Sequence, residues 1–372
     1  MKIQNTEPGM MTPSLEERMM RHRAFWSMEP CDRPLTRFML PPRPATGEDE
    51  YLEALRRNDL ARYWSDPEIL LLRAKRSLAR QHICGDDLPV LNPPFGPSML
   101  SAFLGAKVEF ADNTVWFHPC TDDLADLKDL QFDPNNHWWR IVKEYCSLAS
   151  QEPNVFQGIL DLGGLGDNLA ALIGSEVLMI EMAERPDLVK AVLRRMLDIV
   201  KTCYQEIYAI LERPGKGTVN GFGIWSPGRT GVLQNDMSIM LSTDMYRDFF
   251  YDEFRELCVF FDRSFFHLDG ARSEQHLSEF LLKVPDLDGT QVTGDPGSTA
   301  MQRLPALQLV QRAEKRIFVY VFPDEMEALF AELSPRGVCV ITSMPTEQEA
   351  NDFLHRMTRV CRAANRTADQ TA

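Results

Sequence analysis

The clearest chemical pattern in the sequence is a histidine and an aspartate two residues apart at the end of a short apolar run. His267 and Asp269 stand in the segment Phe265-Phe-His-Leu-Asp269, and residues i and i+2 of a strand point to the same face. A neutral imidazole and a carboxylate on one face can bind a divalent metal ion such as zinc. They can also act as an acid and its orienting partner. We therefore predict that His267 and Asp269 are catalytic and that both are metal ligands.

Other polar and aromatic side chains stand in or just after further short apolar runs. Asp161 ends one run, and Trp225 and Asp236 follow the next. Gln291 and Tyr320 lie in two later runs. Polar residues that converge at the ends of several strands are candidates for one pocket. We predict that Asp236 is catalytic and that the other four bind the substrate.

The elements that must position these residues alternate between short apolar strands and amphipathic helices. Such alternation is typical of parallel strands that are buried on both faces. Eight strand–helix units favour an α/β fold with a closed (β/α)8 barrel over an open sheet. The strands are expected at residues 35–40, 88–91, 155–161, 218–224, 264–268, 289–293, 316–321 and 338–342, with residues 232–235 as an exit from the fourth.

The chain is predicted to be one domain with short extensions. Residues 1–32 form an N-terminal extension whose helix, Leu15 to Trp26, is capped by Ser14 with Glu17 as its reciprocal partner. Residues 33–365 form the barrel, and residues 366–372 are expected to be a disordered tail. Further helices are expected at residues 49–62, 66–79, 129–150, 186–211, 243–259, 273–282, 300–313, 324–333 and 346–364.

The segment between the second and third strands is too long for a simple connection. It runs from Asn92 to Pro119 and carries several aromatic residues, among them Trp116. We predict that this segment is a partial lid over the C-terminal face of the barrel, on the side of His267. Trp116 would then be a wall of the substrate site that excludes water. The alternative is that these aromatic rings pack beneath the lid against the outer helices.

Composition excludes several classes of protein. The 372 residues carry a net charge of −14, which argues against a nucleic-acid partner because phosphate backbones require a basic face. No run reaches the ~18 apolar residues of a membrane span, and residues 1–23 lack the apolar core of a signal peptide. The eight cysteines are scattered without a CxxC pair, which favours a reduced, cytoplasmic protein.

Several common catalytic and binding motifs are missing from the sequence. It contains no GxSxG, no P-loop, no HExxH and no EF-hand loop. The glycines of Gly163-Gly-Leu-Gly166 lack the spacing of a dinucleotide-binding turn.

The order of four segments resembles the uroporphyrinogen decarboxylase superfamily, which contains porphyrinogen decarboxylases and methyltransferases that serve corrinoid proteins. The segments are Asp161–Gly174, Leu241–Phe250, Phe266–Gly270 and Gly337–Phe353. The resemblance covers roughly residues 15–365 and implies a (β/α)8 barrel.

The first strand departs from the porphyrinogen-decarboxylase pattern. Those enzymes carry Arg-Gln-Ala-Gly-Arg there, whereas this chain has Arg33-Pro-Leu-Thr-Arg37. A porphyrinogen with many carboxylates would need more cationic partners than this. The resemblance therefore points to the methyltransferase branch rather than to true uroporphyrinogen decarboxylases.

The metal site of the methyltransferase branch is also altered. That branch binds zinc through His-x-Cys and a later cysteine, whereas Asp269 and Met344 occupy the two cysteine positions here. Aspartate can bind zinc, but methionine is a poor ligand for it. What remains is either a harder nitrogen and oxygen site, made of His267 and Asp269 with Asp236 or Asp161, or no metal at all.

Three functions follow as expectations. The first is methyl transfer from a small methoxylated or methylated donor to a thiol or to a corrinoid protein, the corrinoid being carried by that partner. The second is a cofactor-independent decarboxylase of a small carboxylic acid or porphyrinogen-like substrate, with Arg37, Arg43 and Arg229 holding carboxylates. The third is a non-catalytic barrel that acts as a binding partner. Two or more arginines at the strand ends would favour decarboxylation, and an arginine-free aromatic mouth would favour methyl transfer. The sequence leaves the substrate and the oligomeric state open.

Overall fold

The computed structural model describes residues 13–213 and 215–371, and two groups of mostly parallel strands lie at its centre. The larger sheet has the order β1-β12-β11-β10-β9-β8, and all its strands are parallel. Its strands are β1 (Leu35–Met39), β8 (Thr230–Leu233), β9 (Arg263–Leu268), β10 (Gly289–Val292), β11 (Arg316–Tyr320) and β12 (Val338–Ser343). The fold is therefore α/β, as the sequence predicted.

The smaller sheet has the order β2-β5-β6-β7. Its strands are β2 (Val90–Leu91), β5 (Phe156–Gly158), β6 (Thr218–Val219) and β7 (Trp225–Ser226), of which only β7 is antiparallel to its neighbour. A separate antiparallel hairpin joins β3 (Lys107–Phe110) and β4 (Val115–His118).

The first strand of the chain pairs with the last. Leu35 lies opposite Cys339, and Met39 lies opposite Ser343. The strands β1 and β9 to β12 begin and end within one residue of their predicted positions. Their apolar runs are buried on both faces, which is why they were visible in the sequence.

The predicted fourth strand, residues 218–224, is wrong. β6 ends at Val219, and the chain turns because the side-chain oxygen of Asn220 accepts the N–H groups of Phe222 and Ile224, both at 3.1 Å. Gly223 adopts a φ of 70° in this turn, a conformation that glycine permits without strain. The chain then returns as β7, and β8, expected only as an exit, is a parallel strand beside β9.

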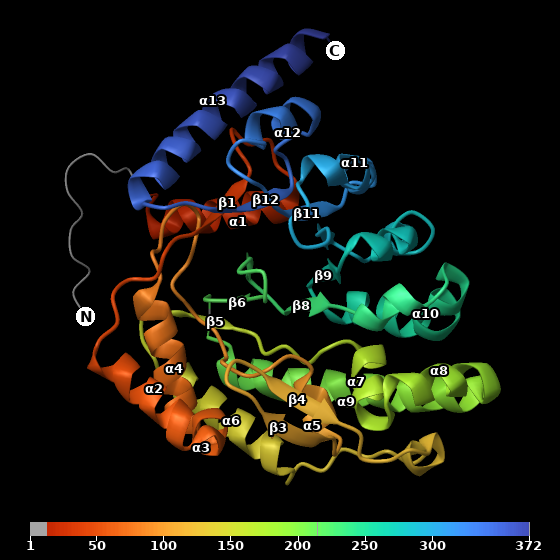
Figure 1. Ribbon diagram of the computed structural model, residues 1–372. Helices are drawn as coiled ribbons and strands as arrows, with labels where there is room; N and C mark the ends of the chain where they lie inside the picture. Colours follow the sequence, from red (N-terminus) through yellow and green to blue (C-terminus); the bar gives the residue numbers. More distant parts are fainter. Residues whose placement is uncertain (1–12, 214, 372) are drawn as a thin grey trace.

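Helices lie outside the strands on all sides visible in Figure 1. The α-helices are α1 (Leu15–Ser27), α2 (Gly47–Asn58), α3 (Leu60–Ser65), α4 (Pro67–Arg80), α5 (Met99–Phe103), α6 (His137–Ser150), α7 (Leu165–Ile173), α8 (Ser175–Glu184), α9 (Pro186–Leu211), α10 (Thr243–Phe260), α11 (Leu304–Arg312), α12 (Met326–Glu332) and α13 (Glu347–Thr371). Short 3₁₀ helices span Leu124–Leu127, Asp236–Met240, Ala271–His276, Leu281–Lys283 and Met301–Arg303. Within the described residues, no helix has both the length and the apolar character needed to cross a membrane.

Three predictions are corrected by these bounds. The helix expected at residues 129–150 begins only at His137, as α6. Residues 273–282, expected as one helix, fall in two short 3₁₀ helices and the link between them. The C-terminal tail, expected to be disordered from residue 366, is helical as far as Thr371 because α13 continues to that point. Residues 1–12 of the predicted extension and residue 372 of the predicted tail lie outside the described residues.

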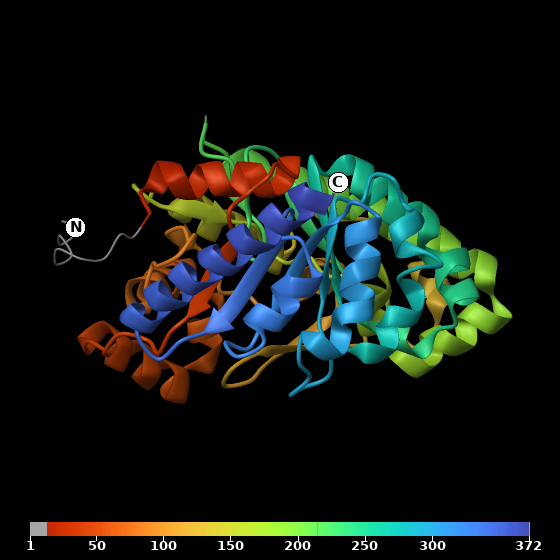
Figure 2. The same cartoon turned by 90° about the horizontal axis from the view of Figure 1, so that it is seen from above.

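α13 and α1 cover different parts of the β1–β12 pair. Figure 2 shows α13 lying across these strands, where Phe353 packs edge-to-face on Phe38 at 6.0 Å between ring centroids. α1 starts with the predicted capping box, since Ser14 and Glu17 exchange backbone–side-chain hydrogen bonds of 2.7 and 3.2 Å. Its Phe25 packs among side chains near the N-terminal ends of the strands, so α1 covers that edge.

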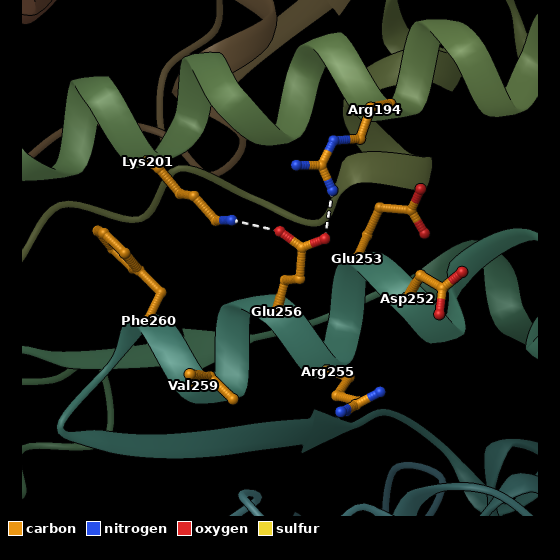
Figure 3. Close-up of a pocket in the computed structure, with 8 residues that line it drawn as sticks. All are labelled: Arg194, Lys201, Asp252, Glu253, Arg255, Glu256, Val259 and Phe260. Atoms are coloured by element: carbon orange, nitrogen blue, oxygen red, sulfur yellow. Dashed lines mark hydrogen bonds and ion pairs between the residues drawn. The ribbon is translucent and has the colours of Figure 1, made fainter.

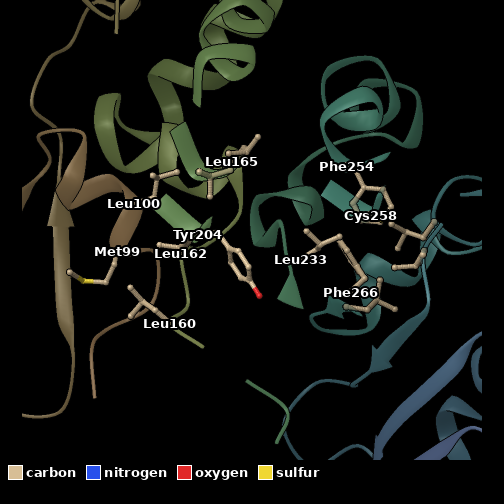
Figure 4. Close-up of a cluster of buried hydrophobic side chains, with 14 of the residues drawn as sticks. Met99, Leu100, Leu160, Leu162, Leu165, Tyr204, Leu233, Phe254, Cys258 and Phe266 are labelled. Carbon is tan, nitrogen blue, oxygen red and sulfur yellow. The ribbon is translucent and has the colours of Figure 1, made fainter. Parts of the chain in front are cut away.

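The main apolar core lies between the strands and the surrounding helices. Figure 4 shows part of it, with Leu162 and Leu165 on one side and Leu233 and Phe266 on the other. Burying a side chain of this size contributes about 1.5–3 kcal/mol. This packed core holds the strands in place. It thereby also fixes their C-terminal ends, which lie opposite the edge that α1 covers.

Candidate functional site

Three of the predicted residues meet at the C-terminal end of β8 and β9. His267 lies in β9, Asp269 follows that strand, and Asp236 opens the 3₁₀ helix after β8. The Nε2 atom of His267 is 3.9 Å from a carboxylate oxygen of Asp236 and 4.0 Å from one of Asp269. One ligand atom from each of the three lies within 4.8 Å of the other two. We call these residues the triad.

The triad fits a divalent metal ion in its chemistry and its spacing. Zinc binds imidazole nitrogen and carboxylate oxygen at about 2.0–2.2 Å, so that ligand atoms of a tetrahedral site stand about 3.4 Å apart. The observed separations need only a small side-chain movement to reach this value. The carboxylates are open to solvent, with side-chain exposures of 51% for Asp236 and 59% for Asp269. An ion can therefore reach them from outside.

A neighbouring strand fixes the orientation of the histidine. Gln291 lies opposite His267 in the pairing of β9 and β10, and its side-chain oxygen contacts Nδ1 of the imidazole. Because an amide oxygen only accepts hydrogen bonds, Nδ1 carries the proton and donates it. In the neutral imidazole, Nε2 is then the unprotonated nitrogen, and it lies on the side of Asp236 and Asp269. A hydrogen-bonded partner of this kind is what metal-binding histidines commonly have.

The surroundings raise the pKa of Asp236 above its usual range. Partial desolvation is the largest cause, the charge of Asp269 adds to it, and His267 opposes it. Asp161, which follows β5 and is open to solvent, is affected in the same way. The protein around Asp161 raises its pKa by desolvation and Asp236 adds to this, whereas the N–H of Gly163 and the charge of His267 lower it. The predicted substrate residue Asp161 is thus within electrostatic reach of the triad.

Asp167, at the start of α7, belongs to the site but was missed from the sequence. Its two carboxylate oxygens accept the backbone N–H groups of Asp236 at 3.0 Å and of Met237 at 2.9 Å. Desolvation and the charge of Asp236 raise the pKa of Asp167 to about 6. The contact needs glycine at position 164, because a Cβ there would lie 2.1 Å from the carbonyl oxygen of Gln234. The glycine-rich segment Gly163–Gly166 was the signal in the sequence from which this contact could have been predicted.

An aromatic ring lies beneath the triad. Phe222, in the turn between β6 and β7, stacks on Phe318 at 4.8 Å and contacts Phe265 at 5.5 Å between centroids. Its ring is 6.2 Å from the imidazole of His267. Phe265 and His267 are two residues apart on β9, so Phe222 lies between the apolar interior and the polar strand ends.

The predicted residue Tyr320 lies on the neighbouring strand β11. Its hydroxyl is 2.8 Å from the hydroxyl of Ser343 at the end of β12, and its ring contacts Phe322 at 5.4 Å. Gln291 and Tyr320 are therefore on strands next to each other, at the same end as His267.

Trp225 does not lie at the strand ends where the sequence predicted a substrate-binding residue. Its side chain is fully buried with Val90, Phe156 and Val219, and its indole N–H donates to the carbonyl of Lys216. The chain reverses at residues 220–224, so Trp225 lies at the edge covered by α1 instead of at the edge of His267. The prediction was wrong because the sequence did not show this reversal.

Arg37 does not offer a free cation to a substrate. Its Nε donates to Asp87 at 2.8 Å, and its guanidinium also donates to the carbonyl oxygen of Phe222. The other two proposed anchors are also engaged: Arg43 is 3.7 Å from Glu347, and Arg229 is 3.3 Å from Asp262. Arg229 precedes β8, at the opposite edge from the triad. The three arginines therefore do not converge on the strand ends.

The segment between β2 and β5 lies partly at the predicted edge. Ser98 packs against Gly163, and the side-chain oxygen of Asn168 accepts the N–H of Ser101 at 2.8 Å. Trp116, farther along, is 59% exposed on the β3–β4 hairpin. Among the described residues, no hydrogen bond or ring contact joins Trp116 to His267. The role of Trp116 as a wall stays a prediction.

The cysteine and methionine of the last strand are not part of the triad. Cys339 is fully buried among apolar side chains, and burial raises the pKa of its thiol. Met344 is also buried, and its backbone N–H donates to the carbonyl of Met39. Neither supplies a thiolate ligand to the strand ends.

A groove on the surface lies elsewhere, between α9 and α10, with a volume of about 540 Å³. Figure 3 shows Glu256 between Lys201 and Arg194, which both donate to its carboxylate. These charges satisfy one another, and the groove carries no residue of the triad.

Comparison with known proteins finds no relative of this chain among family models or curated proteins: no family model matches the chain, and no curated protein matches it.

Proposed function

We propose that this chain is an enzyme that binds a divalent metal ion, zinc in the first place, through Asp236, His267 and Asp269, and moves a methyl group. The donor would be a small methoxylated or methylated compound, and the acceptor a thiol or the corrinoid of a partner protein. The observation that carries the proposal is the triad, with three ligand atoms within 4.8 Å of one another at an open edge.

A closed (β/α)8 barrel of the uroporphyrinogen decarboxylase type is part of the proposal. It is supported by the pairing of β1 with β12 and by the helices outside the strands. In this arrangement, catalytic residues come from the C-terminal ends of several strands. The positions of His267, Gln291 and Tyr320 agree with that rule.

Each residue around the triad would have a separate role in the reaction. A bound divalent ion would supply Lewis acidity, which withdraws electron density from the heteroatom of the donor. Gln291 selects the tautomer of neutral His267 in which Nε2 is the free nitrogen, and Asp167 holds the backbone of Asp236. Phe222 closes the site from below and excludes water from that side.

The arginines favour methyl transfer over decarboxylation. A carboxylate substrate would need cationic partners at the strand ends, and bidentate arginine is the usual one. Arg37, Arg43 and Arg229 are engaged by other groups. The exposed carboxylates also favour an enzyme over a barrel that has lost its chemistry, because a ligand can reach them.

The test is the metal content of the purified protein. The wild type and a His118→Ala control, which removes an exposed histidine of the β3–β4 hairpin, are expected to hold close to one equivalent of metal. His267→Ala should hold at least tenfold less, because the imidazole supplies the only nitrogen ligand of the triad. Stoichiometric metal in His267→Ala would refute the assignment. Methyl transfer is then measured with free cob(I)alamin as acceptor and a methoxybenzene as donor, with metal-stripped protein as the control.

A further inference from the structure

The underside of the proposed substrate site is built from a loop and not from a strand. The turn from Asn220 to Ile224 enters the space between the strands and places Phe222 among three aromatic and imidazole rings. Arg37 holds the turn in place through the carbonyl of Phe222. A side chain on Gly223 would be strained there, because its φ is 70° and its Cβ would lie 2.1 Å from the Arg37 guanidinium carbon. Phe222 is therefore held in one position by its surroundings.

The ring of Phe222 keeps part of its surface free. Phe318 stacks on it and Phe265 meets it from the apolar interior, whereas its neighbour Gly221 is exposed and Phe222 itself is only partly buried. Phe265 and Phe318 each lie two residues before His267 and Tyr320 on their strands. The free part of the ring thus faces the ends of β9 and β11, which carry the imidazole of His267 and the hydroxyl of Tyr320.

The charged side chains that act on the carboxylates of the site are acidic apart from the imidazole of His267. Asp161, Asp236 and Asp269 surround His267, and Arg37, which contacts the Phe222 turn, is paired with Asp87. A divalent ion would offset the two carboxylates of the triad and leave Asp161 uncompensated. A second anion placed there would meet like charge, which is strongly disfavoured.

We infer that Phe222 is the surface on which the substrate lies, and that the site takes an uncharged ligand with a flat apolar group and rejects its carboxylate-bearing counterpart. This inference rests on the proposed function and deepens it. The flat part of the ligand stacks on Phe222, as aromatic pairs do at centroid distances of about 4.5–7 Å. The hydroxyl pair of Tyr320 and Ser343 offers a polar contact that carries no charge. The sequence predicted Trp225 as the substrate-binding aromatic residue of this stretch, and Phe222 takes that role in its place.

The experiment compares two probes with the same ring and methoxy group. 4-Methoxybenzyl alcohol is uncharged, and 4-methoxybenzoate is its carboxylate counterpart. Isothermal titration of the full chain should give an affinity for the alcohol at least tenfold higher than for the benzoate. Equal or tighter binding of the benzoate would overturn the charge part of the inference, and binding of neither probe at millimolar concentration would overturn the site.

Three variants test Phe222 itself. Phe222→Leu should weaken binding of the alcohol about tenfold, and Phe222→Tyr, which keeps the flat ring, should retain it. Phe261→Leu is the matched control, because Phe261 is also a partly buried ring with an aromatic neighbour, Tyr204 at 4.8 Å, but it precedes β9 at the opposite edge. It should leave the affinity unchanged.

Metal content measured on the same samples separates the two proposals. If Phe222→Leu keeps its metal and loses the alcohol, the inference is supported. If Phe222→Leu keeps both, the inference is wrong and the metal site stands. If the wild type holds no metal but binds the alcohol in a Phe222-dependent way, the metal proposal fails and the substrate surface stands.

Discussion

At the scale of single residues, the site depends on groups that orient the triad as much as on the triad itself. Gln291 contacts the imidazole of His267 from the next strand, and Asp167 receives two backbone N–H groups from the loop that carries Asp236. Neither side chain is among the three candidate ligands. Such partners commonly change metal affinity by 10–100-fold when they are removed.

Asp167 provides a direct test of this orienting role. Asp167→Asn keeps the volume of the side chain but replaces one of the two accepting oxygens with a donor, so one N–H of the Asp236 loop loses its partner. We expect the affinity for zinc, measured by competition with a chromophoric chelator, to fall at least tenfold while one equivalent still binds. Asp123→Asn, on the surface near Arg185, should behave as the wild type. An unchanged affinity in Asp167→Asn would mean that the loop holds its position without this carboxylate.

The sequence predicted the triad better than its supports. The His-x-Asp spacing on a strand and an aspartate after the preceding strand were enough to bring His267, Asp269 and Asp236 together. Asp167 and Phe222 act through contacts with chain segments remote in sequence. The glycines before Asp167 were the one local signal for it, and no local pattern marks Phe222. Trp225 is an aromatic residue that could bind a substrate, but the turn at residues 220–224 places it at the other edge.

At the scale of elements, α1 is attached to the strands through a buried histidine. Nδ1 of His22 accepts the backbone N–H of Trp225, and Nε2 donates to the carbonyl of Asp86, both at 3.1 Å. Only the neutral imidazole can satisfy both contacts, since a protonated Nδ1 would face another donor. Burial is the main cause that lowers the pKa of His22 to about 4.

His22 should make the stability of the protein depend on pH. The neutral form is favoured in the folded state, so its contribution is present above the ordinary histidine pKa near 6.5 and is lost as the pH falls toward 4. The difference corresponds to about 3 kcal/mol in the free energy of unfolding. Urea unfolding at a series of pH values should show this decrease in the wild type and in a His118→Gln control. His22→Gln should show a clearly smaller decrease, and an equal one would remove His22 as its cause.

The elements that the sequence predicted well are those with uninterrupted burial. β9 to β12 are short apolar strands with both faces covered, and α9 has an apolar face over its whole length. The β6–β7 hairpin was read as one strand because Thr218 to Ile224 is continuously compatible with a strand, apart from its two glycines. Its direction is set by the hydrogen bonds of the Asn220 side chain, which depend on tertiary packing.

At the scale of the whole molecule, side chains link the two sheets where strand hydrogen bonds do not. Asp86, just before β2, accepts the N–H of Thr36 in β1 at 2.8 Å, and Asp87 accepts that of Phe38 at 3.2 Å. Asp86 is fully buried and forms an ion pair with Arg33, which is 5% exposed. Although burial acts to raise it, the charge and hydrogen bonds of Arg33 hold the pKa of Asp86 below its usual range.

Removing this link should destabilise the whole molecule. Asp86→Ala leaves the buried guanidinium of Arg33 without its carboxylate, and breaking a buried pair in this way costs about 3–5 kcal/mol. Asp32→Ala is the matched control, because Asp32 also pairs with arginines but is 31% exposed, and such pairs are worth about 0–1 kcal/mol. The free energies of urea unfolding at pH 7 compare the two. A loss below about 1 kcal/mol in Asp86→Ala would show that the sheets are held together by other contacts.

The pairing of β1 with β12 also determines when the larger sheet can be completed during synthesis on the ribosome. Leu35 leaves the ribosome early, whereas its neighbour Cys339 is among the later residues to be made. At ordinary rates of translation, the interval is on the order of tens of seconds. During that time β1 lacks its neighbour in the larger sheet. Once β11 has emerged, it is an unpaired edge, of the kind that attracts other chains, until β12 follows. The nascent protein is therefore most exposed to aggregation shortly before its last strand emerges, and a chaperone that covers strand edges would act at that stage.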